Sequence, residues 1–155
     1  MSGNGTGAVE QFDVVIIGAG FGGLYMLHKL REVGFSARVF EMGDGVGGTW
    51  YWNRYPGARC DVESIDYAYA FSPELLADWV WTERYAAQPE ILRYLEHVAD
   101  RFDLRRDIVF GTEIIAAVWD DATNRWTLVT DAGDRVTAPV CVLGVGNLSS
   151  VKQPS

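Results

Sequence analysis

The first forty residues alternate between apolar runs and a helical repeat. Residues 12–17 are mostly β-branched and apolar, which is typical of a strand that is buried on both faces of a parallel sheet. Leu24, Leu27 and Leu30 then recur at helical spacing. A second apolar run follows and ends at Glu41. This order predicts two parallel strands that are joined by one crossover helix.

The middle of the chain predicts one short strand and two helices. Aromatic residues alternate with alanines over residues 67–71, which favours a strand. A Ser-Pro-Glu sequence then predicts a short helix over residues 73–79. The clearest helical repeat covers residues 88–102, and we expect its apolar face to pack on the sheet. His28 and His97 fall on the polar sides of their helices, so we expect both to face solvent.

The last third of the chain predicts strands. Residues 108–110 form a short apolar strand that we expect to join the parallel sheet. Residues 113–119, 125–131 and 135–138 alternate in polarity between polar turns, which predicts an antiparallel meander. Residues 140–143 are a continuous apolar run, typical of a buried parallel strand. The predicted fold is therefore α/β and Rossmann-like, with helices on one side of a parallel sheet and an antiparallel β-meander on the other.

A glycine pattern joins the first strand to the first helix. Gly18-Ala19-Gly20-Phe21-Gly22-Gly23 matches G-x-G-x-x-G in the strand-to-helix context that the pattern requires. Gly18 permits a sharp turn, Gly20 lets the backbone approach a pyrophosphate, and Gly23 lets helix and strand pack closely. Glu41 lies 18 residues after Gly23, near the position of an acid that binds a ribose hydroxyl. The segment predicts an FAD or NAD site, because a carboxylate there repels the 2′-phosphate of NADP; the alternative is a structural glycine turn.

Composition narrows the class of protein. The chain has 155 residues, of which 48% are hydrophobic, so it can form one domain with a core. A net charge of −8 argues against nucleic acid and anionic membrane partners. Cys60 and Cys141 form no C-x-x-C pair, so we expect reduced thiols in a cytoplasmic protein. No histidine has a partner at metal-ligand spacing, and the longest apolar stretch, near residues 140–145, is too short to span a membrane.

A second glycine-rich loop, residues 43–48, leads directly into an aromatic run. Residues 49–55 contain so many large rings that we expect no regular element with one buried face. Rings beside glycine backbone suit a flat heterocycle, which stacks on aromatic faces and accepts backbone hydrogen bonds at its edge. The alternative is that Trp50, Tyr51 and Trp52 only fill the core.

The run from Gly47 to Asp61 resembles the flavin-side loop of type I Baeyer-Villiger monooxygenases. It is most similar to the loop of the phenylacetone, steroid and large-ring cycloketone enzymes in that family. The resemblance continues through residues 63–65, 81–85 and 88–94, and again at 102–105. The related flavin-containing N- and S-oxygenases share the first glycines but lack this aromatic run.

The resemblance implies a function for the complete protein. It would be an NADPH- and O2-dependent flavin monooxygenase that converts ketones to esters or lactones through a C4a-peroxyflavin. Asp61 would orient a catalytic arginine that lies outside this chain, in a charge-assisted pair; the alternative for Asp61 is a surface ion pair or a turn cap. Two other functions stay open, namely a flavin monooxygenase that oxidises N or S atoms and an FAD-binding fragment without turnover.

The resemblance also implies cofactor contacts for individual residues. The first glycine loop would hold the FAD pyrophosphate, and Glu41 would hold the adenosine ribose. Residues 49–52 would line the flavin, while Arg59, Cys60 and Asp61 would border the nicotinamide of NADPH. The expected cofactor-binding residues are Gly18, Gly20, Phe21, Gly22, Gly23, Glu41, Gly48, Thr49, Trp50, Tyr51, Trp52, Arg59, Cys60, Asp61, Tyr67, Ile114 and Asn147.

Three of these residues lie outside the two glycine loops and the aromatic run that follows them. By the same resemblance, Tyr67 and Asn147 would lie near the flavin, and the backbone at Ile114 would meet the adenine. Residues 144–146, Gly-Val-Gly, stand where the family has Ala/Ser-Thr/Ser-Gly. This mild departure removes a hydroxyl but keeps the close approach of the backbone to a ligand.

The domain organisation is expected to be incomplete. Residues 1–11 are rich in Gly, Ser and Asn and predict a flexible leader. Residues 12–155 would form an FAD-binding domain, but the chain carries no second G-x-G-x-x-G for an NADP domain. We therefore expect the amino-terminal part of a longer oxygenase. It would be inactive by itself, and its partners would be the remainder of the enzyme, a small ketone and O2.

Overall fold

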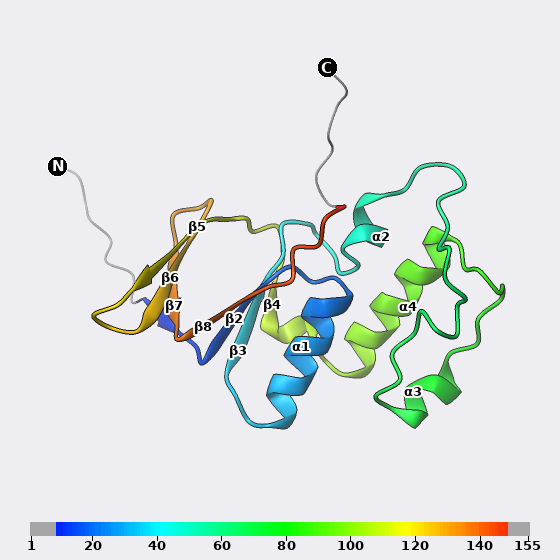
Figure 1. Ribbon diagram of the computed structural model, residues 1–155, viewed down its shortest axis with the longest axis horizontal. Coiled ribbons are helices and arrows are strands. Elements are labelled where there is room, and N and C mark those ends of the chain that lie inside the picture. Colours follow the sequence, from blue (N-terminus) through cyan, green and yellow to red (C-terminus); the bar gives the residue numbers. More distant parts are fainter. Residues whose placement is uncertain (1–8, 149–155) are drawn as a thin grey trace, which may run out of the picture.

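A four-stranded parallel sheet lies at the centre of the fold, in the order β4-β3-β2-β8 (Figure 1). The computed structural model describes residues 9–148. Ile16 in β2 is level with Val39 in β3 and with Val142 in β8, so the apolar runs predicted from the sequence lie side by side. The strands are β2 (Val14–Ile17), β3 (Ala37–Phe40), β4 (Ile108–Val109) and β8 (Val140–Leu143).

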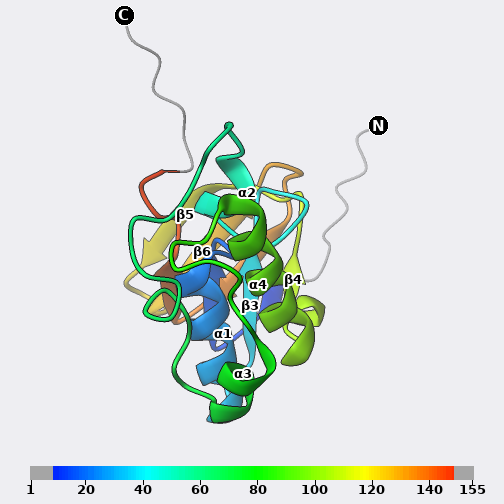
Figure 2. The same ribbon diagram turned by 90° about the vertical axis from the view of Figure 1, so that its right-hand side faces the viewer.

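Helices cover one face of this sheet, as Figure 2 shows from the helical side. The crossover helix α1 runs from β2 to β3, and its Leu24 and Leu27 share a buried cluster with Ile16 and Val39. Helix α4 adds Ile91, among other apolar residues, to that same cluster. The elements are α1 (Phe21–Glu32), α2 (Thr49–Trp52), α3 (Pro73–Asp78), α4 (Gln88–Arg101) and the 3-10 turn η1 (Arg105–Asp107).

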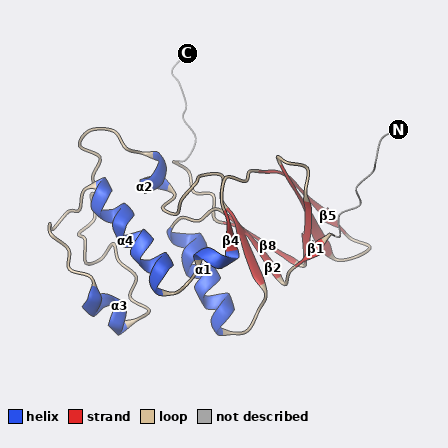
Figure 3. Ribbon diagram, turned by 180° about the vertical axis from the view of Figure 1, so that it is seen from behind, coloured by secondary structure: helices blue, strands red, loops and turns tan. Residues whose placement is uncertain are grey.

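A second, mainly antiparallel sheet covers the other face, so the molecule has three layers (Figure 3). Val15 and Phe40 from the parallel sheet pack against Leu128, Val136 and Ala138 in a second buried cluster. The predicted α/β class and layer order are therefore confirmed. The second sheet has the order β1-β7-β6-β5, with β1 (Glu10–Gln11), β5 (Ile114–Asp120), β6 (Arg125–Thr130) and β7 (Arg135–Ala138).

Strand β1 differs from the expected leader. Glu10 and Gln11 pair with β7 in parallel, opposite Val136 and Thr137. Val9 precedes β1, and residues 1–8 of the predicted leader lie outside the described residues.

The strand predicted over residues 67–71 is wrong. These residues form turns and bends, and the amide of Tyr69 donates to the Tyr94 hydroxyl, 2.8 Å away, instead of to a neighbouring strand. The rings of Tyr67 and Tyr69 pack on Phe21, with centroid distances of 4.9 and 5.1 Å. The alternation of aromatic residues with alanines therefore reflects packing against α1 and α4 rather than pairing in a sheet.

Two other expectations about regular structure also fail. Thr49–Trp52 forms the single helical turn α2, although the aromatic run predicted no regular element. Strand β8 is only partly buried, with Val140 47% and Leu143 69% exposed, because it is the edge strand of the parallel sheet. A continuous apolar run cannot distinguish an edge strand from a central one.

The two histidines do not face solvent as expected. The His28 ring lies 4.5 Å from that of Phe71 and 4.6 Å from that of Phe102, and desolvation lowers the pKa of His28. The His97 ring lies 5.4 Å from that of Trp79, and its Nε2 is buried without a hydrogen bond. The segment around α3 covers both histidines, which the periodicity of α1 and α4 alone cannot reveal.

Three further features bear on the expected class of protein. Cys60 and Cys141 are free thiols. Within residues 9–148, no helix is long and apolar enough to cross a membrane. Over the same residues, no three His, Cys, Asp or Glu side chains come together as metal ligands would.

Candidate functional site

A cleft crosses the carboxyl ends of β2, β3 and β8, where ligands bind in open α/β sheets. It consists of two hollows of about 180 Å³ each, which share Gly20, Gly48, Gly144 and Val145. The first hollow is also lined by Ile17, Gly18, Phe40, Glu41, Met42, Trp52, Thr112, Glu113 and Ile114. The second is also lined by Phe21, Gly22, Gly47, Thr49, Trp50, Tyr67 and Gly146.

The floor of the cleft is bare backbone. The two glycine loops touch so closely that a Cβ on Gly48 would lie 2.9 Å from the Cα of Gly20. Gly18 has a φ of +100°, and a Cβ there would lie 2.6 Å from the Gly144 carbonyl oxygen. Across residues 9–148, the amides of Gly20, Phe21 and Gly22 donate no hydrogen bond, as is usual in the first turn of a helix. These amides can therefore bind an anion such as a phosphate.

Glu41 connects the two glycine loops. Its side chain is only 5% exposed, and one carboxylate oxygen accepts from the Ala19 amide at 2.7 Å. The other accepts from the Gly43 amide, also at 2.7 Å. A carboxylate oxygen has more than one lone pair, so a ribose hydroxyl can still donate to it. The sequence identified Glu41 as a ligand residue but missed this structural role.

An aromatic wall closes the second hollow. The indole Nε1 of Trp50 donates to the Tyr67 hydroxyl at 3.1 Å, and the rings of Phe21 and Tyr67 meet edge to face. Burial raises the pKa of Tyr67, although the hydrogen bond from Trp50 opposes this shift. The wall is therefore neutral at physiological pH and presents apolar rings with one phenol to any bound ligand.

The aromatic run separates into different positions. Trp50 lines the second hollow and Trp52 the first. Tyr51 lines neither: its ring packs on Gly43 and Gly45, and its hydroxyl accepts from the Asp44 amide at 3.1 Å. It supports the second glycine loop from behind, a role that sequence spacing could not separate from that of its neighbours.

Five further predicted residues also lie outside the hollows. Gly23 is buried beneath the cleft, where a Cβ would collide with the Gly18 carbonyl oxygen. Cys60 is buried, whereas Arg59, Asp61 and Asn147 are exposed. Burial is the main cause of the raised pKa of Tyr67, and the charge of Asp61 adds to it. The Tyr67 amide donates to the Glu63 carbonyl at 2.9 Å, which joins the segment that carries Asp61 to the wall of the second hollow.

Several lining residues were not predicted. Met42, Thr112 and Glu113 line the first hollow, whereas Val145, which lines both, belongs to the 144–146 segment that was expected to approach a ligand. Thr112 belongs to the turn between β4 and β5, and its amide donates to the Glu41 carbonyl at 3.0 Å. The position of this turn directly after a parallel strand was the available signal, since such ends converge at one edge of the sheet.

Alkaline pH should destabilise the fold around this wall. Burial raises the pKa of Tyr67, Tyr69 and Tyr94 above the ordinary value of 10.0, so the folded chain holds these protons more tightly than the unfolded chain. Their contribution to stability is complete below that value and is lost as the pH rises above it. Urea unfolding of the full-length protein from about pH 8 to about pH 11 should show this loss, and Tyr69→Phe should reduce it. Tyr55→Phe, at a 64% exposed position, is the control and should not change the profile.

Comparisons with known proteins agree with this geometry. Residues 16–75 match the family of NAD(P)-binding Rossmann-like domains. A Baeyer-Villiger monooxygenase from Pseudooceanicola batsensis is 51% identical over 93% of this chain. The chain is homologous to the Baeyer-Villiger monooxygenases. It spans about a quarter of their length, namely 27% of that relative.

Two other monooxygenases are similar to this chain. A solved steroid monooxygenase bound to NADP is 60% identical and superimposes with a TM-score of 0.91, over 94% of this chain and 28% of its own. A phenazine N-monooxygenase from Lysobacter antibioticus is 51% identical over 93% of this chain and 27% of its own. The predicted resemblance is confirmed, and these relatives include an enzyme named for oxidation at nitrogen.

Proposed function

We propose that this chain is the FAD-binding part of an NADPH- and O2-dependent monooxygenase that oxidises ketones to esters or lactones. The observation that carries the proposal is the two-part cleft, which has the backbone of two glycine loops as its floor. Its first hollow offers the Glu41 carboxylate and its second an aromatic wall. The similarity to Baeyer-Villiger monooxygenases selects this chemistry among dinucleotide-binding proteins.

FAD fits the residues that are present. The first hollow would take the adenosine, with Glu41 on the ribose and Ile114 beside the adenine, and the amides of Gly20 and Gly22 would hold the pyrophosphate. The second hollow would take the flavin against Trp50. The chemistry that FAD supplies when bound is hydride acceptance from NADPH and activation of O2.

The chain's own residues would place the cofactor and exclude water. The buried Trp50 and the half-buried Tyr67 remove solvent from the second hollow, which strengthens electrostatic interactions there. Arg59, Cys60 and Asp61 would face the nicotinamide, and Asp61 would orient an arginine supplied by the remainder of the protein. In this proposal residues 12–155 are an incomplete FAD-binding domain that does not turn over alone.

The expected partners are a small ketone, O2 and the rest of the enzyme. A net charge of −8 disfavours nucleic acid and anionic membranes. The two free thiols favour a reducing compartment, so we place the protein in the cytoplasm.

Oxidation at nitrogen is the second candidate, because a phenazine N-monooxygenase is as similar to this chain as the Baeyer-Villiger relative. Product analysis distinguishes the two. The full-length protein, loaded with FAD and supplied with NADPH and O2, should convert cyclohexanone or phenylacetone to the lactone or ester. Formation of phenazine N-oxide without any ester would favour the second candidate, and NADPH oxidation with neither product would contradict both.

A further inference from the structure

The segment that carries Asp61 is held by a second segment, residues 82–88. The amide of Cys60 donates to the Ala86 carbonyl at 3.1 Å, and the Gln88 amide donates to the Ala58 carbonyl at 2.9 Å. The amide of Ser64 donates to the Arg84 carbonyl at 2.7 Å. Both ends of the 58–64 segment are therefore fixed by backbone hydrogen bonds to the same neighbour.

Ser64 makes the most buried of these connections. It is 3% exposed, and its hydroxyl accepts from the Ala86 amide at 2.9 Å. The same hydroxyl can donate its proton to the carbonyl of Glu83, at 2.8 Å, or to that of Arg84, at 3.1 Å. Removal of this oxygen would leave the buried Ala86 amide without an acceptor, which is unfavourable for a buried donor.

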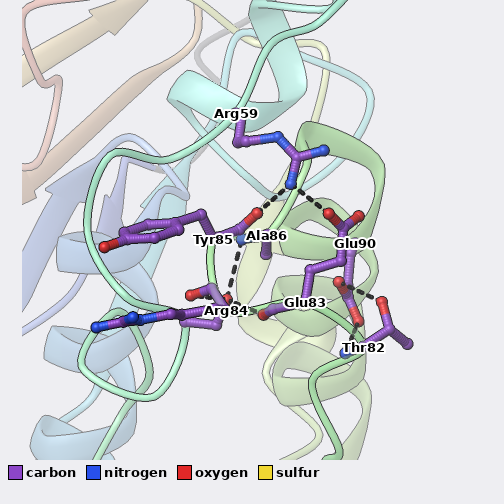
Figure 4. Close-up of polar contacts among 8 residues, drawn as sticks. Arg59, Thr82, Glu83, Arg84, Tyr85, Ala86 and Glu90 are labelled. Carbon is purple, nitrogen blue, oxygen red and sulfur yellow. Dashed lines mark hydrogen bonds and ion pairs between the residues drawn. The ribbon is translucent and has the colours of Figure 1, made fainter.

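Figure 4 shows the other connections of residues 82–88, to Arg59 and to Glu90. Arg59 pairs with Glu83 at 2.6 Å and also donates to the Tyr85 carbonyl. Thr82 donates through its amide and its hydroxyl to the buried Glu90 in the first turn of α4, at 2.9 Å each. The exposed Arg59–Glu83 pair stabilises little by itself, since solvent screens such pairs.

Asp61 lies between these fixed points with its side chain exposed. No hydrogen bond or ion pair of its carboxylate occurs within residues 9–148. The same segment is joined to the wall of the second hollow, because the Tyr67 amide donates to the Glu63 carbonyl at 2.9 Å. The fold thus fixes the backbone on both sides of Asp61 and leaves its carboxylate exposed, in a segment that is joined to the wall of the cleft.

We propose that Ser64 is the positioning residue for Asp61, and that it acts by fixing residues 60–64 against residues 83–86. This inference rests on the proposed function, because it assigns Asp61 a task in the oxygenation reaction. Ser64 contacts no substrate or cofactor in this arrangement and acts only through the place it gives to Asp61.

The test compares Ser64→Ala, Asp61→Ala and the double variant in the full-length, FAD-loaded protein. Ser64→Ala should keep its FAD but form product about tenfold to a hundredfold more slowly, because small misplacements in an active site have effects of this size. The product formed per NADPH consumed should fall as well. The double variant should be no slower than Asp61→Ala alone, since Ser64 acts through Asp61.

Two variants separate positioning from general loss of stability. Ser64→Thr keeps the hydroxyl and should restore most of the coupling of NADPH to product. Ser72→Ala removes another buried hydroxyl, which caps α3 by accepting from the Leu75 amide, and should leave coupling unchanged.

Additive effects in the double variant, or full activity of Asp61→Ala, would overturn the proposal. If Ser64→Ala does not fold, Ser64→Thr is compared with wild type instead. A loss of the coupling of NADPH to product in Ser64→Thr would also overturn the proposal. Failure of the proposed function itself would appear in the wild-type protein, as an absence of ester or lactone.

Discussion

Glu41→Ala should remove FAD from the full-length protein and destabilise its apoprotein by about 3 kcal/mol. The loss has two causes. The variant lacks the acceptor for a ribose hydroxyl, and it leaves the amides of Ala19 and Gly43 without their partner in a buried site. Each unpaired buried group costs about 1–3 kcal/mol. Flavin absorbance per protein measures the first effect, and urea unfolding of the flavin-free protein measures the second.

Glu41→Gln and Glu32→Gln are the matched controls. The amide side chain of the Glu41→Gln variant would have one acceptor oxygen and would direct an NH2 group at the other backbone amide, so we expect an intermediate loss of both FAD and stability. Glu32 is half exposed and pairs only with the neighbouring Lys29 and His28, so its amide variant should behave like wild type. A Glu41→Ala protein with normal flavin content and normal stability would contradict the connection between the two glycine loops.

Local periodicity predicted most of the fold, because in most helices and strands the apolar residues that recur along the sequence form the buried face. The run at residues 140–143 pairs with β2, and the three alternating segments form the meander as expected. The prediction failed at residues 67–71, where the alternating rings pack on Phe21 and Tyr94 instead of forming a strand. A pattern of this kind specifies which side chains are buried, but not whether a partner strand is present.

The site likewise has one part that the sequence predicted and another that it did not. Glycine spacing located the floor of the cleft, because Gly18, Gly23 and Gly48 occupy positions where the backbone conformation or the lack of space permits only glycine. The pairing of Trp50 with Tyr67 and the bonding of Ser64 to the 83–86 segment depend on tertiary contacts 17 or more residues apart. These contacts leave no periodic signal in the sequence. Only the family resemblance could suggest that Trp50 and Tyr67 lie together, and nothing in the sequence suggested the bonding of Ser64.

Gly23→Ala should unfold or severely destabilise the protein, whereas Gly22→Ala should not. A Cβ at position 23 would collide with the carbonyl group of Gly18, which is backbone that directly follows β2 and cannot move without displacing the end of that strand. Overpacking of this kind costs about 1–3 kcal/mol even where side chains can adjust, so we expect about 3 kcal/mol or more here. Urea unfolding of the flavin-free, full-length protein measures the difference.

Gly22→Ala then separates folding from ligand binding at the neighbouring residue. A Cβ at position 22 meets no atom within 4 Å, and alanine favours the helix, so the apoprotein should be as stable as wild type or more stable by up to about 1 kcal/mol. Gly22 lines the second hollow, however, and a methyl group there would occupy space next to the free amides of the first turn. FAD should therefore bind at least about tenfold more weakly, a difference of about 1.4 kcal/mol. If Gly22→Ala bound FAD as tightly as wild type, the pyrophosphate could not lie against the start of α1. Normal stability of Gly23→Ala would contradict the close packing of α1 on β2.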